Sequence, residues 1–298
     1  MEKFKGEEFI KFTERFPTDE SCYAYLADIK WNNGFVCKKC GHEKYSQREN
    51  YKRCCTLCKH IESTTAGTLF HKVKFGIRKA FYIMFEMAAS TKGLSSSQVG
   101  RRYGISRKSA WLFMHKVRLG MESSKSYPID GIVQVDEFVV GGKENNKQGR
   151  SYDSKKKKVC CAVELTDEGK VKRVYAIRIK DFSNKSLQKI FDSFISRVAS
   201  VKTDEWKGYN PLKKEYNIEQ IPSSNGHNLK QLHTIVHQIK SWLRTNYSWV
   251  HQEHLDKYLG EYSFRINRSI FKDTIFHNLT LRMMHRSHVG YKNIIVST

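Results

Sequence analysis

The chain contains no run of about 18 consecutive apolar residues, the length that a membrane-spanning helix needs. It also lacks the start of a secretory signal, because Met1 to Glu8 carries charges of both signs and no apolar stretch follows. These absences predict a cytoplasmic protein with no membrane partner. Thiols stay reduced in that compartment, so we expect its eight cysteines to be free or to bind metal rather than to form disulfides.

Acidic residues are scarce. The 298 residues include 30 Asp and Glu against 53 Lys and Arg, which gives a formal net charge of +23. Such an excess indicates a polyanionic partner, most simply DNA or RNA, although a basic surface that only maintains solubility is the alternative. Hydrophobic residues make up 39% of the chain, which suffices for folded cores and argues against disorder over most of its length. The length allows two or three domains.

The cysteines include two CxxC pairs. Cys37 and Cys40 form the first pair, Cys55 and Cys58 the second, and 14 residues separate the pairs. Four thiolates at this spacing can form a tetrahedral shell around one structural zinc ion. The alternatives are a redox CxxC and a small domain lined with reduced thiols. Cys54 could in principle replace its neighbour, but Cys55 gives the CxxC spacing.

A pair of helices joined by a tight turn is predicted over residues 94–118. A leucine and a run of serines begin the first helix, and the turn covers residues 103–106. The second helix begins with basic and hydroxyl side chains that suit phosphates and base edges. An ordinary helical hairpin with a basic face is the alternative. We expect a helix-turn-helix that contacts DNA through Ser106, Arg107, Lys108 and Ser109.

Two aspartates stand at the ends of strand-like segments. Strands are predicted over 131–140, 159–165, 171–179 and 201–204, with a helix over 183–199 before the last of them. Asp136 lies in the first strand and Asp204 ends the fourth. In a ribonuclease-H-like core, which has this element order, the first and fourth strands are neighbours. Their carboxylates can then hold a pair of divalent metal ions, whereas two acids that cap turns or pair with lysines are the alternative.

The third ligand of such a site is less evident from the sequence. A helix predicted over 228–246 is placed to supply it, but it carries no glutamate. The candidates are Gln238, His237 just before it, and Glu261 further along the chain. An amide oxygen binds a hard cation weakly, and an imidazole is a borderline ligand.

Motifs along nearly the whole chain resemble bacterial insertion-sequence transposases of the ISXO-two-like type, the fifteen-ninety-five group. The motif around Asp136 is the most specific of them. The matching segments are Phe16–Cys22 with Trp31 and Gly34, the four CxxC cysteines, Ser63–Thr68, Val135–Lys143, Thr203–Tyr209 and Lys257–Arg268.

This resemblance implies a DDE-type transposase that uses two Mg²⁺ or Mn²⁺ ions at Asp136 and Asp204. It would cleave DNA at the ends of its element and join them to target DNA. The zinc ribbon and helix-turn-helix would bind the terminal inverted repeats of double-stranded DNA, with the protein as a homo-oligomer. The match puts Gln238 where relatives carry Glu or Asn, and relatives that use His keep His237 as a candidate.

The expected fold is therefore α/β, with a ribonuclease-H-like mixed sheet flanked by helices. We predict a zinc-ribbon domain with a helical lead-in over 1–73, a helix-turn-helix over 74–124, and the transposase core with a C-terminal helical tail over 125–298.

Two alternative functions stay open. One is a catalytically impaired or domesticated transposase that only binds DNA, and the other is a nuclease or resolvase that cuts without joining.

Overall fold

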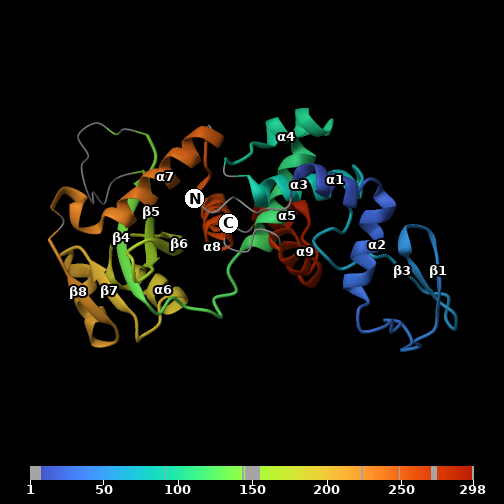
Figure 1. Ribbon diagram of the computed structural model, residues 1–298, viewed down its shortest axis with the longest axis horizontal. Coiled ribbons are helices and arrows are strands. Elements are labelled where there is room, and N and C mark those ends of the chain that lie inside the picture. The colour runs from blue at the N-terminus through green and yellow to red at the C-terminus, as the bar shows by residue number, and fades with distance from the viewer. Residues whose placement is uncertain are drawn as a thin grey trace. The chain divides into compact units, whose positions relative to one another are not determined.

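The chain forms two compact units (Figure 1). A computed structural model describes residues 8–90, 92–142, 144, 155–222, 224–247, 249–269 and 274–296. One unit comprises Met1–Met121 and Ser269–Thr298, and the other comprises Glu122–Arg268. These units follow from contacts within the chain. The functional boundaries predicted at residues 73 and 124 stay predictions.

The first unit combines helices with a small antiparallel sheet. Phe12 of α1 stacks on Phe85 of α3 with ring centroids 4.2 Å apart, and Phe276 of α9 meets Phe12 edge-on at 4.7 Å. Helix α9, near the end of the chain, thus shares an aromatic core with α1 and α3. The elements are α1 Phe9–Arg15, α2 Asp19–Lys30, β1 Tyr45–Gln47, η1 Glu49–Tyr51, β2 Arg53–Cys55, β3 Ile61–Glu62, α3 Ile77–Ala89, α4 Ser96–Tyr103, α5 Arg107–Met121, α9 Ile275–His285 and α10 Tyr291–Val296.

The two helices predicted after residue 94 are confirmed as α4 and α5. Ser95 caps α4, since its side chain accepts a hydrogen bond from the backbone N–H of Gln98. Gly104 ends α4 in the left-handed conformation (φ 59°), which a glycine adopts without strain. Ser106 then accepts from the N–H of Ser109 at 3.1 Å and begins α5. Whether this pair binds DNA as a helix-turn-helix stays a prediction.

The second unit is built on a five-stranded mixed sheet in the order β6-β5-β4-β7-β8. The first three strands in sequence are antiparallel neighbours, whereas β4–β7 and β7–β8 are parallel. The predicted mixed α/β class is therefore confirmed. The elements are β4 Ile132–Val140, β5 Lys157–Leu165, β6 Val171–Ile179, α6 Asn184–Phe194, β7 Ser200–Thr203, η2 Lys207–Lys214, β8 Asn217–Gln220, η3 Ser224–Leu229, α7 Lys230–Asn246, η4 Gln252–His254 and α8 Leu255–Asn267.

Each face of this sheet buries its own apolar cluster, because side chains alternate along a strand. Phe138 and Cys161 point to the face covered by α7 and α8. Val135 and Cys160 point to the opposite face, which packs against α6 and η2. Strands β4 and β5 therefore have apolar residues on both sides of the sheet.

Three element predictions need correction. The helix predicted to run to residue 199 ends at Phe194, and Ile195 pairs with Ile129 in an isolated parallel bridge. The fourth strand ends at Thr203, so Asp204 follows β7 rather than closing it. Strand β8 was not predicted. Among the described residues, no helix has both the length and the apolar composition to cross a bilayer.

Candidate functional site

The pairing of β4 with β7 brings the two aspartates to the same edge of the sheet. The parallel ladder runs from Ile132 opposite Ser200 to Val135 opposite Thr203. Asp136 and Asp204 each follow the last residue that is paired in this parallel ladder, although β4 itself continues to Val140. Because parallel strands end on the same side of a sheet, the two residues come next to one another. This is the arrangement that the element order predicts.

Both carboxylates are partly buried and locally held. Asp136 Oδ1 accepts a hydrogen bond of 2.7 Å from the N–H of Glu137, and Asp204 Oδ1 accepts one of 3.1 Å from the N–H of Trp206. The side chain of Gln220 in β8 donates to the carbonyl of Asp204 at 3.2 Å. These contacts fix one oxygen of each carboxylate and the backbone behind it.

Helix α7 lies over this edge, and a side chain of β4 sets its position. Gln134 accepts a hydrogen bond of 3.0 Å from the N–H of Leu232 and donates to Gln231 at 3.3 Å. The helix buries Leu232, Ile235, Val236 and Ile239 against the sheet. Its rotation about its own axis is therefore determined by its apolar face.

That rotation turns His233 toward the aspartates. Its Nε2 lies 3.9 Å from Asp136 Oδ2. Burial lowers the pKa of His233, and His237 and Lys240 lower it further, while Asp204 opposes the shift. The imidazole is consequently neutral near pH 7, which is the form that can bind a metal ion.

Lys240 lies on the same face of α7, seven residues after His233. Its Nζ is 5.4 Å from the centroid of the Phe138 ring. Burial lowers the pKa of Lys240, and the nearby carboxylate of Asp136 partly offsets that effect. A cation therefore stands beside the two acids, on the side of the sheet that carries Asp136.

The three candidates for a third ligand occupy different places. His237 is exposed, one turn from His233 on the same face. Gln238 points roughly 140° around the helix from His233, and its Oε1 accepts a hydrogen bond of 3.0 Å from Tyr262. Glu261 is 1% exposed and lies on α8, which packs against β6, two strands from β4. The structure thus gathers Asp136, Asp204 and His233.

His233 was not among the candidates named from the sequence. Its position four residues before His237 and seven before Lys240 was visible, because this spacing puts all three on one helical face. Two carboxylates and one neutral imidazole fit Mg²⁺ or Mn²⁺, which favour oxygen ligands, with Mn²⁺ tolerating nitrogen more readily.

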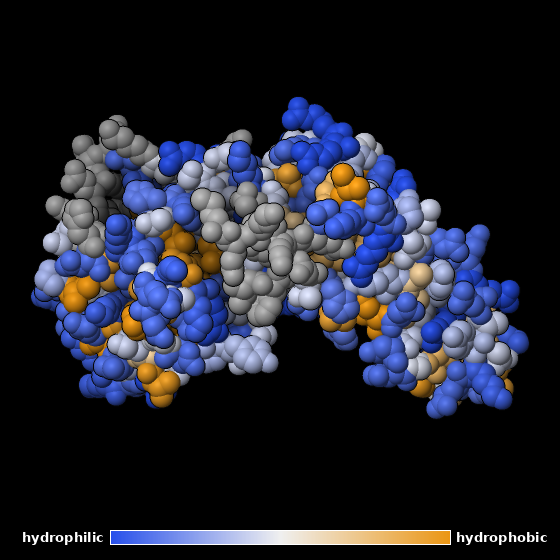
Figure 2. All heavy atoms as spheres, in the orientation of Figure 1, coloured by the Kyte–Doolittle hydropathy of each residue, from blue (hydrophilic) through white to orange (hydrophobic). Residues whose placement is uncertain are grey.

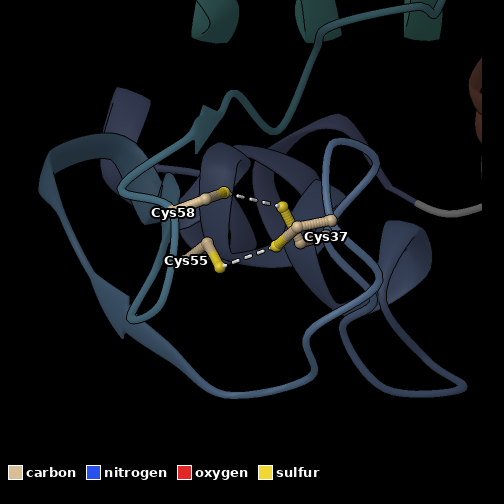
Figure 3. Close-up of side chains that lie close together, drawn as sticks. Cys37, Cys55 and Cys58 are labelled. Atoms are coloured by element: carbon tan, nitrogen blue, oxygen red, sulfur yellow. Dashed lines mark hydrogen bonds between the residues drawn. The ribbon is translucent and has the colours of Figure 1, made fainter.

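The four CxxC cysteines form a second centre, in the first unit. Figure 3 shows the sulfurs of Cys37, Cys55 and Cys58 turned toward one another between the two knuckles. Cys37 and Cys58 have sulfurs 3.6 Å apart, as do Cys40 and Cys55, and all four lie within 4.8 Å of one another. Zinc–sulfur bonds of about 2.3 Å in a tetrahedron require sulfurs about 3.8 Å apart, so the cluster fits zinc.

The backbone around the cluster is shaped for thiolates. Gly41 donates to the carbonyl of Cys37 at 2.8 Å, and Lys59 donates to that of Cys55 at 3.1 Å, so both knuckles close in the same way. Burial opposes ionisation of Cys55, but hydrogen bonds from the N–H groups of Cys58 and Leu57 lower its pKa to about 7. A thiolate is the form that binds zinc.

Comparison with protein families matches residues 17–61 to the transposase zinc-ribbon domain and residues 128–267 to the ISXO2-like transposase domain. The chain belongs to the ISXO2-like transposase family. The second match includes Asp136, Asp204 and His233, and the first includes all four cysteines. The resemblance predicted from the motifs is therefore confirmed. Within the motif around Asp136, Lys143 lies outside the described residues.

A curated relative extends this likeness over most of the chain. An uncharacterized protein in transposable element ISH50 of Halobacterium salinarum is 22% identical over 287 residues. The alignment covers 86% of this chain and 93% of the relative. The likeness thus spans both compact units.

The helices α4 and α5 of this ISXO2-like transposase lie outside both family matches. Arg107 and Lys108 are exposed at the start of α5, and Lys108 Nζ lies 4.6 Å from the centroid of the Tyr291 ring. The hydroxyl of Ser106 donates to that of Ser109 at 2.9 Å. The two basic side chains are therefore open to a ligand, while the serines shape the helix start.

Proposed function

We propose that this chain is a DDE-type DNA transposase that cleaves DNA at the ends of its element and joins them to target DNA. The observation that carries the proposal is the parallel pairing of β4 and β7, which brings Asp136 and Asp204 to one sheet edge. The strand order, with one acid on the central strand and one on its parallel neighbour, supports a ribonuclease-H-like core.

In this proposal Asp136, Asp204 and His233 hold two Mg²⁺ or Mn²⁺ ions. The bound ions would activate the attacking hydroxyl and stabilise the leaving oxygen. The N–H groups of Glu137 and Trp206 hold one oxygen of each carboxylate, and the second oxygen of Asp136 faces His233. Lys240, beside Asp136, would contact a phosphate of the bound strand.

The partner in this proposal is double-stranded DNA. The net charge of +23 supports a polyanionic ligand, and the zinc ribbon with α4 and α5 would bind the terminal inverted repeats. Arg107 and Lys108, with the adjacent Ser106 and Ser109, would contact phosphates and base edges. Two such ends must meet for joining, so the active form would be a homo-oligomer on DNA.

The decisive experiment incubates the purified protein with a plasmid that carries both ends of its element and with a second, target plasmid. We expect nicked and joined products in Mg²⁺ or Mn²⁺ and none when neither ion is added and the zinc is retained. Cut but unjoined ends would indicate a nuclease or resolvase instead. DNA binding without any metal-dependent product would indicate a transposase that has lost catalysis.

The proposed role of His233 as the third metal ligand can be tested separately. Replacing His233 with alanine should lower the rate of DNA cleavage roughly 100-fold or more at fixed Mg²⁺, because one ligand of the metal pair is lost. His233→Glu should restore much of the rate, since a carboxylate suits Mg²⁺ better than an imidazole does.

Two neighbouring variants serve as matched controls for His233. Gln238→Ala and His237→Ala change the same helix without removing the side chain closest to Asp136, so we expect less than a 10-fold loss from either. Cleavage rates measured across a Mg²⁺ titration separate metal binding from folding. If Gln238→Ala lowered the cleavage rate more than His233→Ala did, Gln238 rather than His233 would be the third metal ligand.

A further inference from the structure

An exposed tryptophan lies just after α7. The indole of Trp249 is 70% exposed, although Tyr247 and Val250 near it are packed. The ring of Tyr247 lies 4.2 Å from that of Tyr258, and Val250 is 8% exposed within the cluster under α7 and α8. Tyr247 and Val250 are therefore packed against their neighbours, while the indole of Trp249 faces solvent. Figure 2 shows that hydrophilic residues cover most of the visible face.

A lysine fixes the position of this tryptophan relative to the sheet. Lys157 Nζ lies 4.6 Å from the centroid of the Trp249 ring, a cation–π contact. Lys157 pairs with Val140 across the β4–β5 ladder, and Asp136 lies four residues earlier on β4. Because side chains alternate, Asp136, Phe138 and Val140 share one face of the sheet, about 13 Å from the first to the last.

Cationic side chains also lie along the face between Asp136 and Trp249. Lys240 lies over Phe138, midway along this face, and its electrostatic neighbours are Asp136, Lys156 and Arg244. Lys157 stands at the far end. A row of positive charge thus leads from the two aspartates to an exposed indole. Such a row fits a phosphate backbone, and about 13 Å corresponds to about four nucleotides of a B-form strand, or fewer if the strand is extended.

We propose that Trp249 is a stacking site for one unpaired base of the DNA strand whose phosphate is bound at Asp136 and Asp204. This inference rests on the proposed function. An indole stacks on any base, whereas a base still paired in a duplex already stacks on its neighbours. The site therefore selects DNA that is frayed or single-stranded next to the reacting phosphate, with Lys157 neutralising the adjacent phosphate.

The test compares two DNA probes without added Mg²⁺ or Mn²⁺ and with the zinc retained, so that it does not depend on catalysis. One is a blunt 30-base-pair duplex, and the other carries a six-nucleotide 3′ thymine tail on the same duplex. We expect Trp249→Ala to bind the tailed probe about 5- to 100-fold more weakly by fluorescence anisotropy and the blunt probe unchanged. Trp249→Phe keeps an aromatic face and should retain most of the affinity.

A scan of the tail identifies the stacked base. Removing one base at a time to leave an abasic sugar should weaken binding of the unaltered protein at a single position. At that position Trp249→Ala should show no further loss, because both changes remove the same contact. A 2-aminopurine placed there should lose fluorescence on binding the unaltered protein and keep it with Trp249→Ala.

Tyr127→Ala is the matched control. Tyr127 is 76% exposed in the same unit, before the start of β4 and so toward the opposite end of the strand from Val140. Equal losses from Tyr127→Ala and Trp249→Ala would overturn the inference, as would equal losses on both probes or no tail-dependent binding. Trp249→Ala could weaken binding of the tailed probe alone while the unaltered protein fails to cleave DNA. That result would support stacking, and the missing cleavage would count only against the proposed function.

Discussion

Replacing Asp136 or Asp204 with asparagine should abolish DNA cleavage and joining, with a loss of about 1,000-fold or more. Each substitution removes a negative charge that would hold a divalent ion, and such an ion contributes several kcal/mol to the transition state. Asparagine keeps an oxygen where Glu137 or Trp206 now donates its N–H, so the local fold should persist. The measurement is the single-turnover rate of plasmid cleavage in Mg²⁺ and in Mn²⁺.

Glu205→Gln is the matched control for this charge change. Glu205 is exposed and directly follows Asp204 in the chain. Its replacement removes a carboxylate from the same loop without changing the proposed metal site, so we expect cleavage within about threefold of the unaltered protein. Thermal unfolding of all three variants checks that the core is intact. Full activity in Asp136→Asn or Asp204→Asn would exclude a metal site at this sheet edge.

The sheet was predictable because its signals are local. A strand-like run predicted β5, alternation predicted β6, and Asp136 marked the end of the apolar run in β4. The neighbouring position of β4 and β7 followed from the element order that the sequence shares with ribonuclease-H-like cores. Strand β8 was missed because Asn217–Gln220 has only four residues, with no face fully buried.

The orientation of α7 was the hardest feature to predict. The match to relatives favoured Gln238, whereas the face that α7 turns toward the aspartates carries His233. That face depends on Gln134, which fixes the start of α7 from another element through a contact absent from any local pattern. The same reasoning applies to Phe276, whose partner Phe12 lies at the other end of the chain.

Removing zinc should unfold the ribbon while the sheet of the second unit stays folded. Strands β1, β2 and β3 contain three, three and two residues, too few to be stable alone. The buried cluster around Cys37 and Cys55 adds only Ala27, Trp31 and Phe35. Zinc binding by such small domains has an apparent free energy of roughly 10–16 kcal/mol, so the metal supplies most of their stability.

We therefore expect one zinc ion per chain, lost in Cys37→Ser and in Cys55→Ser. Without it, residues 17–61 should become sensitive to protease and exchange their amide hydrogens rapidly, while β4, β5 and β7 remain protected. Cys54→Ser is the control, because Cys54 lies outside the four-sulfur cluster although it directly precedes Cys55. Zinc lost from Cys54→Ser but kept in Cys55→Ser would show that the knuckle uses the other cysteine. A protected ribbon in metal-free protein would mean that apolar packing alone holds it.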